Sequence, residues 1–167
     1  MFERFGDLPL HVLVIHAAIV LLPTAALVAI VFAVRPGWRW LLRWPVLLLA
    51  LGAAATAFLA RQSGLAFVTA KPALAQLVAV HKSRGNLLFY FTLGFAAVAI
   101  LAFLWLTGPT ALASGRGAKT RQATSINRLL DLAVSAGLFV MAVLVAWQTY
   151  RTGDSGARAV WEGTLPK

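Results

Sequence analysis

The sequence contains no cysteine, and only 5 of its 167 residues are acidic. Without cysteine the chain can form neither disulfides nor thiolate metal sites, and it has no thiol nucleophile. Charged residues make up 12% of the chain, about half of their share in a typical soluble domain. Hydrophobic residues make up 60%, and the mean hydropathy is +0.82. This composition indicates an integral membrane protein.

Common catalytic motifs are also missing from the sequence. It has no P-loop, no nucleophile elbow and no pair of carboxylates for acid–base catalysis. Asp131 is the only carboxylate close to an apolar run, and we interpret it as an interface residue paired with an arginine. The net charge of +10 does not indicate nucleic-acid binding, because the basic residues lie beside apolar runs instead of forming a face of their own. Nothing here predicts an enzyme.

Four apolar runs are each long enough to cross a bilayer, which needs about 20 apolar residues. We expect spans at about residues 9–34, 40–60, 87–106 and 126–150, with a short first connection and longer second and third ones. This pattern predicts an all-α fold: an antiparallel bundle of four transmembrane helices in one domain (residues 1–150), followed by a polar tail (151–167). The apolar segment 73–80 is too short to span, so it predicts an interfacial helix or an extension of the third span.

Tryptophan and arginine alternate at the start of the second span, as in an aromatic belt whose arginines reach the headgroups. The predicted membrane-interface residues are Trp38, Trp40, Trp44, Arg39, Arg43 and, at the far end of the third span, Trp105.

Basic residues are denser in the connections after the first and third spans than on the other side of the membrane. By the positive-inside rule that denser side is cytoplasmic, so we expect both termini outside. The residues counted on it are Arg35, Arg39, Arg43, Arg116, Lys119, Arg121 and Arg128.

Small residues recur every four positions in the second span, at Gly52, Thr56 and Ala60. Small residues on one face let membrane helices approach closely. The lipid bilayer is one predicted partner of the chain, and this face could also pack against a membrane-protein partner or a second copy.

The three histidines are the strongest candidates for a functional site, because ionisable residues inside spans often mark one. His11 and His16 begin the first span and His81 precedes the third, so the predicted topology places all three near the outer side. One hypothesis is axial ligation of a b-type haem by histidines from two helices; others are a metal or proton-relay site. A third interpretation is structural, with each imidazole bonded to a neighbouring helix. His16 lies deepest, so we expect it to point into the bundle.

The opening motif LPLHVLVIH, followed by an alanine- and leucine-rich span, resembles a bacterial membrane-protein family of unknown function. Members of that family are four-helix proteins that open with a leucine-proline-x-histidine-proline-x-x-valine-histidine pattern, and some are fused to a Rieske-type iron–sulfur domain. Pro9, His11 and His16 match the pattern, whereas Val12 replaces its second proline. The resemblance implies a protein of the bacterial inner membrane. By association it suggests a redox function; the alternative is a non-catalytic subunit or assembly factor of a larger membrane complex.

Overall fold

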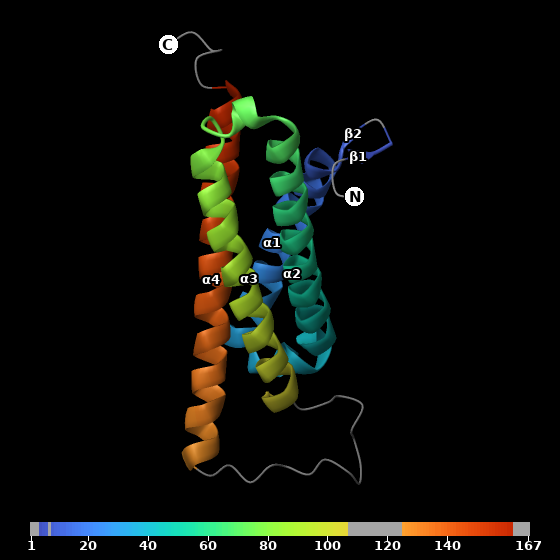
Figure 1. Ribbon diagram of the computed structural model, residues 1–167. Helices are drawn as coiled ribbons and strands as arrows, with labels where there is room; N and C mark the ends of the chain where they lie inside the picture. The colour runs from blue at the N-terminus through green and yellow to red at the C-terminus, as the bar shows by residue number, and fades with distance from the viewer. Residues whose placement is uncertain (1–3, 7, 107–124, 162–167) are drawn as a thin grey trace.

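Four long helices make up the fold. The computed structural model describes residues 4–6, 8–106 and 125–161. In Figure 1 the helices stand side by side, and helices adjacent in sequence run in opposite directions. Each helix packs against two others in the cyclic order α1–α2–α3–α4, so α4 closes the ring against α1. All four are long and apolar enough to span a membrane. The predicted four-helix antiparallel bundle is confirmed; its helices are α1 (Leu10–Val34), α2 (Arg39–Ala70), α3 (Ala79–Trp105) and α4 (Ser125–Trp161).

Short elements that the sequence analysis did not predict lie between and before these helices. Strands β1 (Arg4–Phe5) and β2 (Leu8–Pro9) form an antiparallel pair before α1. The 3₁₀ turns η1 (Pro36–Trp38) and η2 (Pro72–Leu74) precede α2 and follow it. Each 3₁₀ turn begins with proline, whose fixed φ suits a first helical position. The basic connection expected after the third span falls in residues 107–124, outside the described part of the chain.

Three helices are longer than the predicted spans. α2 continues past Ala60 to Ala70, α3 begins at Ala79 instead of Leu87, and α4 continues past Tyr150 to Trp161. Of the predicted segment 73–80, only Ala79 and Val80 belong to α3, and the residues before them form η2 and the turns at 75–78. The third span is therefore extended back to Ala79 only, and the rest of the segment is not one continuous helix. With a rise of about 1.5 Å per residue, α4 extends roughly 55 Å, which exceeds a hydrocarbon core of about 30 Å. Polar residues continue these helices because their backbone groups stay hydrogen-bonded beyond the membrane core.

Small side chains fill most of the bundle core. Alanines bring the helix backbones together, and larger side chains such as Phe32 and Phe95 fill the space that remains. Large apolar side chains such as Val20 and Leu104 point outward, where lipid surrounds them. The fully enclosed core residues, each with 0% exposure, are Leu22, Ala25, Ala29, Ala50, Ala53, Phe95, Ala99, Ala102, Leu138, Ala142 and Val145.

Enlarging Ala99 should destabilise the bundle, because its side chain has no exposed surface. We expect Ala99→Leu to cost about 1–3 kcal/mol of unfolding free energy through overpacking. Ala97→Leu is the matched control, since Ala97 lies exposed two positions earlier on the same helix. Thermal unfolding in detergent measures both, and equal midpoints for the two variants would contradict this packing.

Candidate functional site

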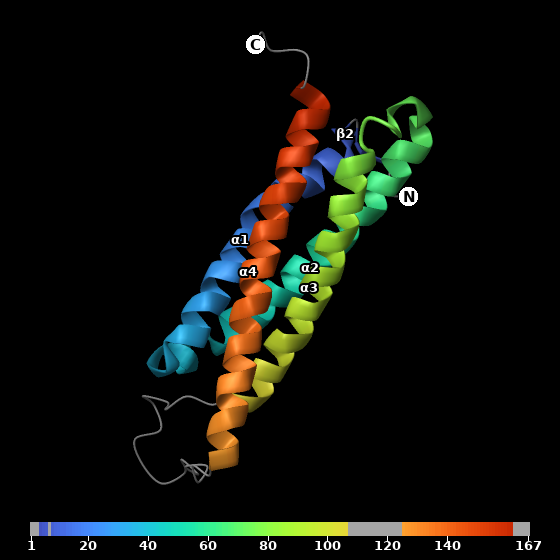
Figure 2. The ribbon, with the colours of Figure 1, turned by 90° about the vertical axis from the view of Figure 1, so that its left-hand side faces the viewer.

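Two of the three histidines meet at one end of the bundle. The start of α1, the end of α2, the start of α3 and the end of α4 all lie at this end (Figures 1 and 2). We call it the histidine end, because it carries His11 on α1 and His81 on α3. The extra turns of α2 and α4 form the opposing surfaces that these two side chains reach.

His11 is bonded to the end of α2. Its Nδ1 lies 3.0 Å from the carbonyl oxygen of Ala60 and 3.2 Å from Oγ of Ser63. The Ser63 hydroxyl in turn donates to the carbonyl of Leu59 at 2.7 Å, within its own helix. The ring also lies against Gly64: a Cβ atom added to that glycine would come within 3.1 Å of His11 Cε1. The side chain is half-buried between α1 and α2.

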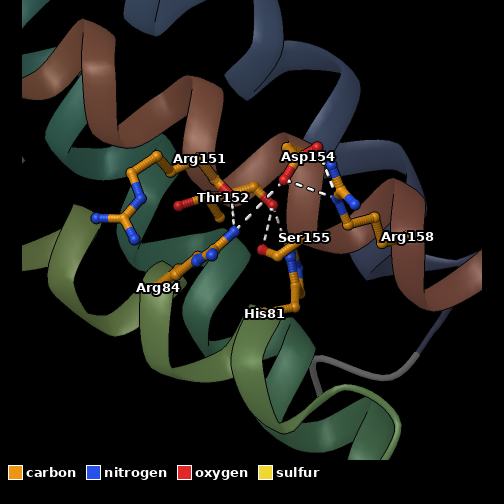
Figure 3. Close-up of polar contacts among 7 residues, drawn as sticks. All are labelled: His81, Arg84, Arg151, Thr152, Asp154, Ser155 and Arg158. Carbon is orange, nitrogen blue, oxygen red and sulfur yellow. Dashed lines mark hydrogen bonds and ion pairs between the residues drawn. The ribbon is translucent and has the colours of Figure 1, made fainter.

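His81 makes the corresponding contacts with the end of α4. Its Nδ1 lies 3.0 Å from the carbonyl oxygen of Thr152, and the Ser155 hydroxyl donates to the same oxygen at 2.9 Å. Figure 3 shows His81 and Ser155 converging on this carbonyl. A Cβ atom added to Gly156 would come within 3.0 Å of both Cε1 and Nδ1 of the ring.

These bonds determine which ring nitrogen carries the proton. A carbonyl oxygen can only accept, so Nδ1 must be the donor in both His11 and His81. In the neutral imidazole, Nε2 then holds the lone pair and is free to accept a proton or bind a metal ion. The ring centroids are 6.2 Å apart with an interplanar angle of 74°. The histidine end therefore holds two close imidazoles, each oriented by a backbone carbonyl.

The expectation that His16 points into the bundle is wrong. His16 is exposed on the outer surface of α1, and its Nδ1 donates to the carbonyl of Val12 at 2.6 Å, one turn back on the same helix. A position five residues beyond His11 is rotated by about 140° around the helix, so the two side chains cannot share a face. Because His11 faces α2, His16 has to face away from the bundle. The deeper histidine is not the enclosed one.

One buried hydroxyl near His81 has no partner. Among the described residues, Thr152 Oγ1 is the one buried side-chain polar atom without a hydrogen bond. Leaving such a group unpaired costs about 1–3 kcal/mol, so it usually indicates water or a ligand. It belongs to the residue whose carbonyl receives His81.

A polar network joins α3 to α4 around the same site. Arg84 Nη1 donates to the carbonyl of Arg151 at 2.9 Å and lies 3.6 Å from Oδ2 of Asp154 (Figure 3). Asp154 also accepts from Arg158 at 3.0 Å. The buried amide of Gln148 donates to the carbonyl of Arg84 at 3.0 Å. The partly exposed ion pairs add little stability, but together these bonds fix the helix end that receives His81.

The opposite end of the bundle holds the predicted interface residues. Trp38, Trp40 and Trp44 are exposed, as an aromatic belt requires. Arg39 differs from these tryptophans: the residue is only 8% exposed, and its guanidinium donates to Ser135 at 2.8 Å across the bundle. Its side chain therefore extends inward and does not reach outward to the headgroups.

Asp131 and the remaining interface residues are held by neighbouring helices. Trp105 Nε1 donates to Asp131 at 2.9 Å. Arg39 also interacts electrostatically with this carboxylate, as expected for an arginine partner. Arg43 donates to the carbonyl of Phe103 at 2.9 Å, and its guanidinium carbon lies 4.2 Å from the centre of the Phe103 ring. Between α3 and α4 here, a cavity of about 140 Å³ is lined only by Leu101, Trp105, Leu130 and Val134, and it offers no ligand for a metal ion.

The small-residue face of α2 is used within the chain. Leu21 of α1 lies 3.4 Å from where a Cβ on Gly52 would stand. Ala60, two turns further on, supplies the carbonyl that holds His11. At these positions the face receives α1, so it supports the bundle itself and gives no evidence of an outside partner.

The sequence matches one known protein family. A sequence model described as "Predicted membrane protein (DUF2231)" matches residues 7–166. The chain belongs to this family. The DUF2231 match covers all four helices and both contacting histidines, and it confirms the resemblance carried by the opening motif. No curated protein and no solved structure matches the chain significantly.

The two histidines of α1 should respond differently to substitution, because His16 is exposed and His11 is half-buried. We expect His11→Ala to lower the unfolding free energy by about 0.5–1.5 kcal/mol, because it removes the bond from the imidazole to the Ala60 carbonyl and the packing of the ring against Gly64. His16→Ala should change it by less than about 0.5 kcal/mol, since that side chain bonds only its own helix. Thermal unfolding of both variants in one detergent tests this; a larger loss from His16→Ala would reverse the assignment.

Proposed function

We propose that this DUF2231 protein is a membrane redox protein whose histidine end holds one metal centre between His11 and His81. The observation that carries the proposal is the paired orientation of the rings. Both Nδ1 atoms donate to backbone carbonyls, which leaves both Nε2 lone pairs for a metal. Almost every metal-ligating histidine donates its other ring N–H to a carboxylate, a backbone carbonyl or a water molecule.

The spacing of the rings favours ligation from opposite sides. At metal–nitrogen distances of about 2.0–2.1 Å, two imidazoles on opposite sides of one ion have centroids about 6.4 Å apart, against roughly 5.2 Å in a tetrahedral site. The observed separation is 6.2 Å. This supports an arrangement in which the two histidines are the axial ligands of a six-coordinate centre.

The small number of protein ligands favours haem iron over a bare ion. The described residues contain no group of three or more His, Asp or Glu side chains that could hold a metal ion. A structural ion such as zinc generally takes four protein ligands. Iron in a b-type haem takes its four equatorial ligands from the macrocycle and needs only two axial histidines. Two imidazoles are the axial donor set that such a haem requires, and the described residues supply these two; the group would provide one-electron chemistry there.

The proposal predicts a histidine-dependent haem spectrum. We expect detergent-purified protein mixed with haemin to give the Soret and α/β bands of a low-spin iron with two imidazole ligands. His11→Ala and His81→Ala should each abolish the low-spin spectrum. His16→Ala is the control on the same helix and should leave it unchanged.

Parallel titrations with Zn²⁺ and Cu²⁺ show whether the site binds haem or a metal ion without a macrocycle. Haem binding without tight ion binding supports the proposal as stated. Tight binding of an ion that depends on both histidines, without haem binding, rules out the haem. If neither binds while both variants unfold earlier, the histidines are structural and the proposal is wrong.

We also infer that the histidine end faces the non-cytoplasmic side. The opposite end carries the Trp38–Trp44 belt with its arginines, and basic residues accumulate on the cytoplasmic side of membrane proteins. The start of α1 and the end of α4 both lie at the histidine end (Figure 1), so on this inference both face the non-cytoplasmic side.

A reporter fused to the C-terminus tests this orientation. Alkaline phosphatase is active only after export, so we expect a C-terminal fusion to be active and a fusion at Arg35, between α1 and α2, to be inactive. A green fluorescent reporter should show the opposite pattern. Fluorescence of the C-terminal fusion would place the histidine end in the cytoplasm.

A further inference from the structure

The two histidines are held by the same local structure. In α2 the carbonyl of Ala60 receives His11, Ser63 lies three residues later, and Gly64 lies four residues later. In α4 the carbonyl of Thr152 receives His81, with serine and glycine at the same two offsets. We call this arrangement the Ser-Gly notch: a carbonyl acceptor, a serine at i+3 whose hydroxyl bonds that carbonyl, and a glycine at i+4 against the imidazole. Its copies are residues 60–64 and 152–156.

The contacts within the two notches agree closely. Both Nδ1–carbonyl distances are 3.0 Å. The Ser63 and Ser155 hydroxyls lie 3.2 and 2.9 Å from the respective carbonyls, and they differ in that Ser63 has a shorter bond to Leu59. A Cβ on Gly64 would lie 3.1 Å from its ring, and one on Gly156 would lie 3.0 Å from its ring. Since atoms rarely approach a Cβ so closely, only glycine leaves each ring its observed place.

The agreement extends along the whole bundle. His81 lies 70 positions after His11, and the same displacement carries five of the six buried residues of α1 onto buried residues of α3. Buried positions 22, 25, 26, 29 and 32 correspond to buried positions 92, 95, 96, 99 and 102. A displacement of 92 carries the notch of α2 onto that of α4, and buried positions 46, 50, 53 and 63 onto buried positions 138, 142, 145 and 155. The second displacement is larger mainly because the connection between α3 and α4 is longer than the one between α1 and α2.

We propose that the chain is two copies of one helical hairpin, α1–α2 and α3–α4, and that each copy carries a complete half-site. The half-site is a histidine on the first helix and a Ser-Gly notch on the second. Gly64 and Gly156 are its positioning residues: they let the ring approach the helix backbone, so that Nδ1 reaches the carbonyl. The two rings, one from each hairpin, then lie with their centroids 6.2 Å apart.

This inference concerns how the rings are held, and it stands whether or not a metal binds. A methyl group at either glycine should push one ring away from its carbonyl and release its tautomer. Gly153 provides a matched control, because it lies in the same stretch of α4 and a Cβ there would meet nothing within 4 Å.

Nitrogen NMR of the imidazoles tests the inference in the full-length protein. With ¹⁵N-labelled histidine, we expect the wild type to show protonated Nδ1 and unprotonated Nε2 for both His11 and His81. Gly64→Ala should mix the tautomers of His11 only, Gly156→Ala those of His81 only, and Gly153→Ala neither. Unchanged shifts in both notch variants would overturn the positioning role.

A double-variant comparison covers the case in which a single variant folds poorly. Gly64→Ala should lower the unfolding midpoint by several degrees in the wild type, but by much less in the His11→Ala background, where no ring occupies the notch. The pair Gly156→Ala and His81→Ala should behave alike. Equal losses in both backgrounds would show that the glycines serve only the helices. If the NMR result holds while haem fails to bind, the metal centre is wrong and the repeated half-site remains.

Discussion

Close approach of helix backbones is the constraint on which the whole bundle depends. Lipid tails are as apolar as the side chains they touch, so membrane helices gain nothing by hiding leucine and must instead pack tightly. Alanine at the enclosed positions of all four helices meets this need, and the large apolar residues are left to face lipid. The short distance between backbones is also what brings a side chain of one helix to the carbonyls of the next.

The histidine contacts use that closeness in a particular way. The carbonyls of Ala60 and Thr152 lie within helices, and each oxygen has a second lone pair beyond the one used along its own helix. His11 and His81 take this second lone pair, while the nearby glycines remove the side chain that would stand in the way. The result is a pair of imidazoles held by the backbone, which side-chain substitutions elsewhere disturb less than a site built from side chains alone.

Sequence alone predicted the helix number, the antiparallel order and the end of the bundle that carries the histidines, because each follows from the lengths of the apolar runs. It failed at the helix ends: polar residues such as Arg61 and His81 look like loop residues, yet tertiary hydrogen bonds keep them helical. It also chose His16 over His11 by depth, although the direction of a side chain depends on which face of α1 meets α2. The Ser-Gly pairs at 63–64 and 155–156 were the available signal, and their meaning appears only when each is seen opposite a histidine.

Each repeated hairpin contains an even number of spans, and this determines the direction of the axis that relates the two hairpins. Two copies of a two-span unit enter the membrane in the same orientation, so the axis that relates them runs across the membrane. Transporters built from inverted repeats have their axis in the membrane plane, and exchanging the states of the two halves opens the central site to either side in turn. In a parallel pair, rotating one hairpin onto the other returns the same face, so the symmetry keeps both half-sites at one end of the bundle. That is why His11 and His81 share the histidine end, although 69 residues separate them in the sequence.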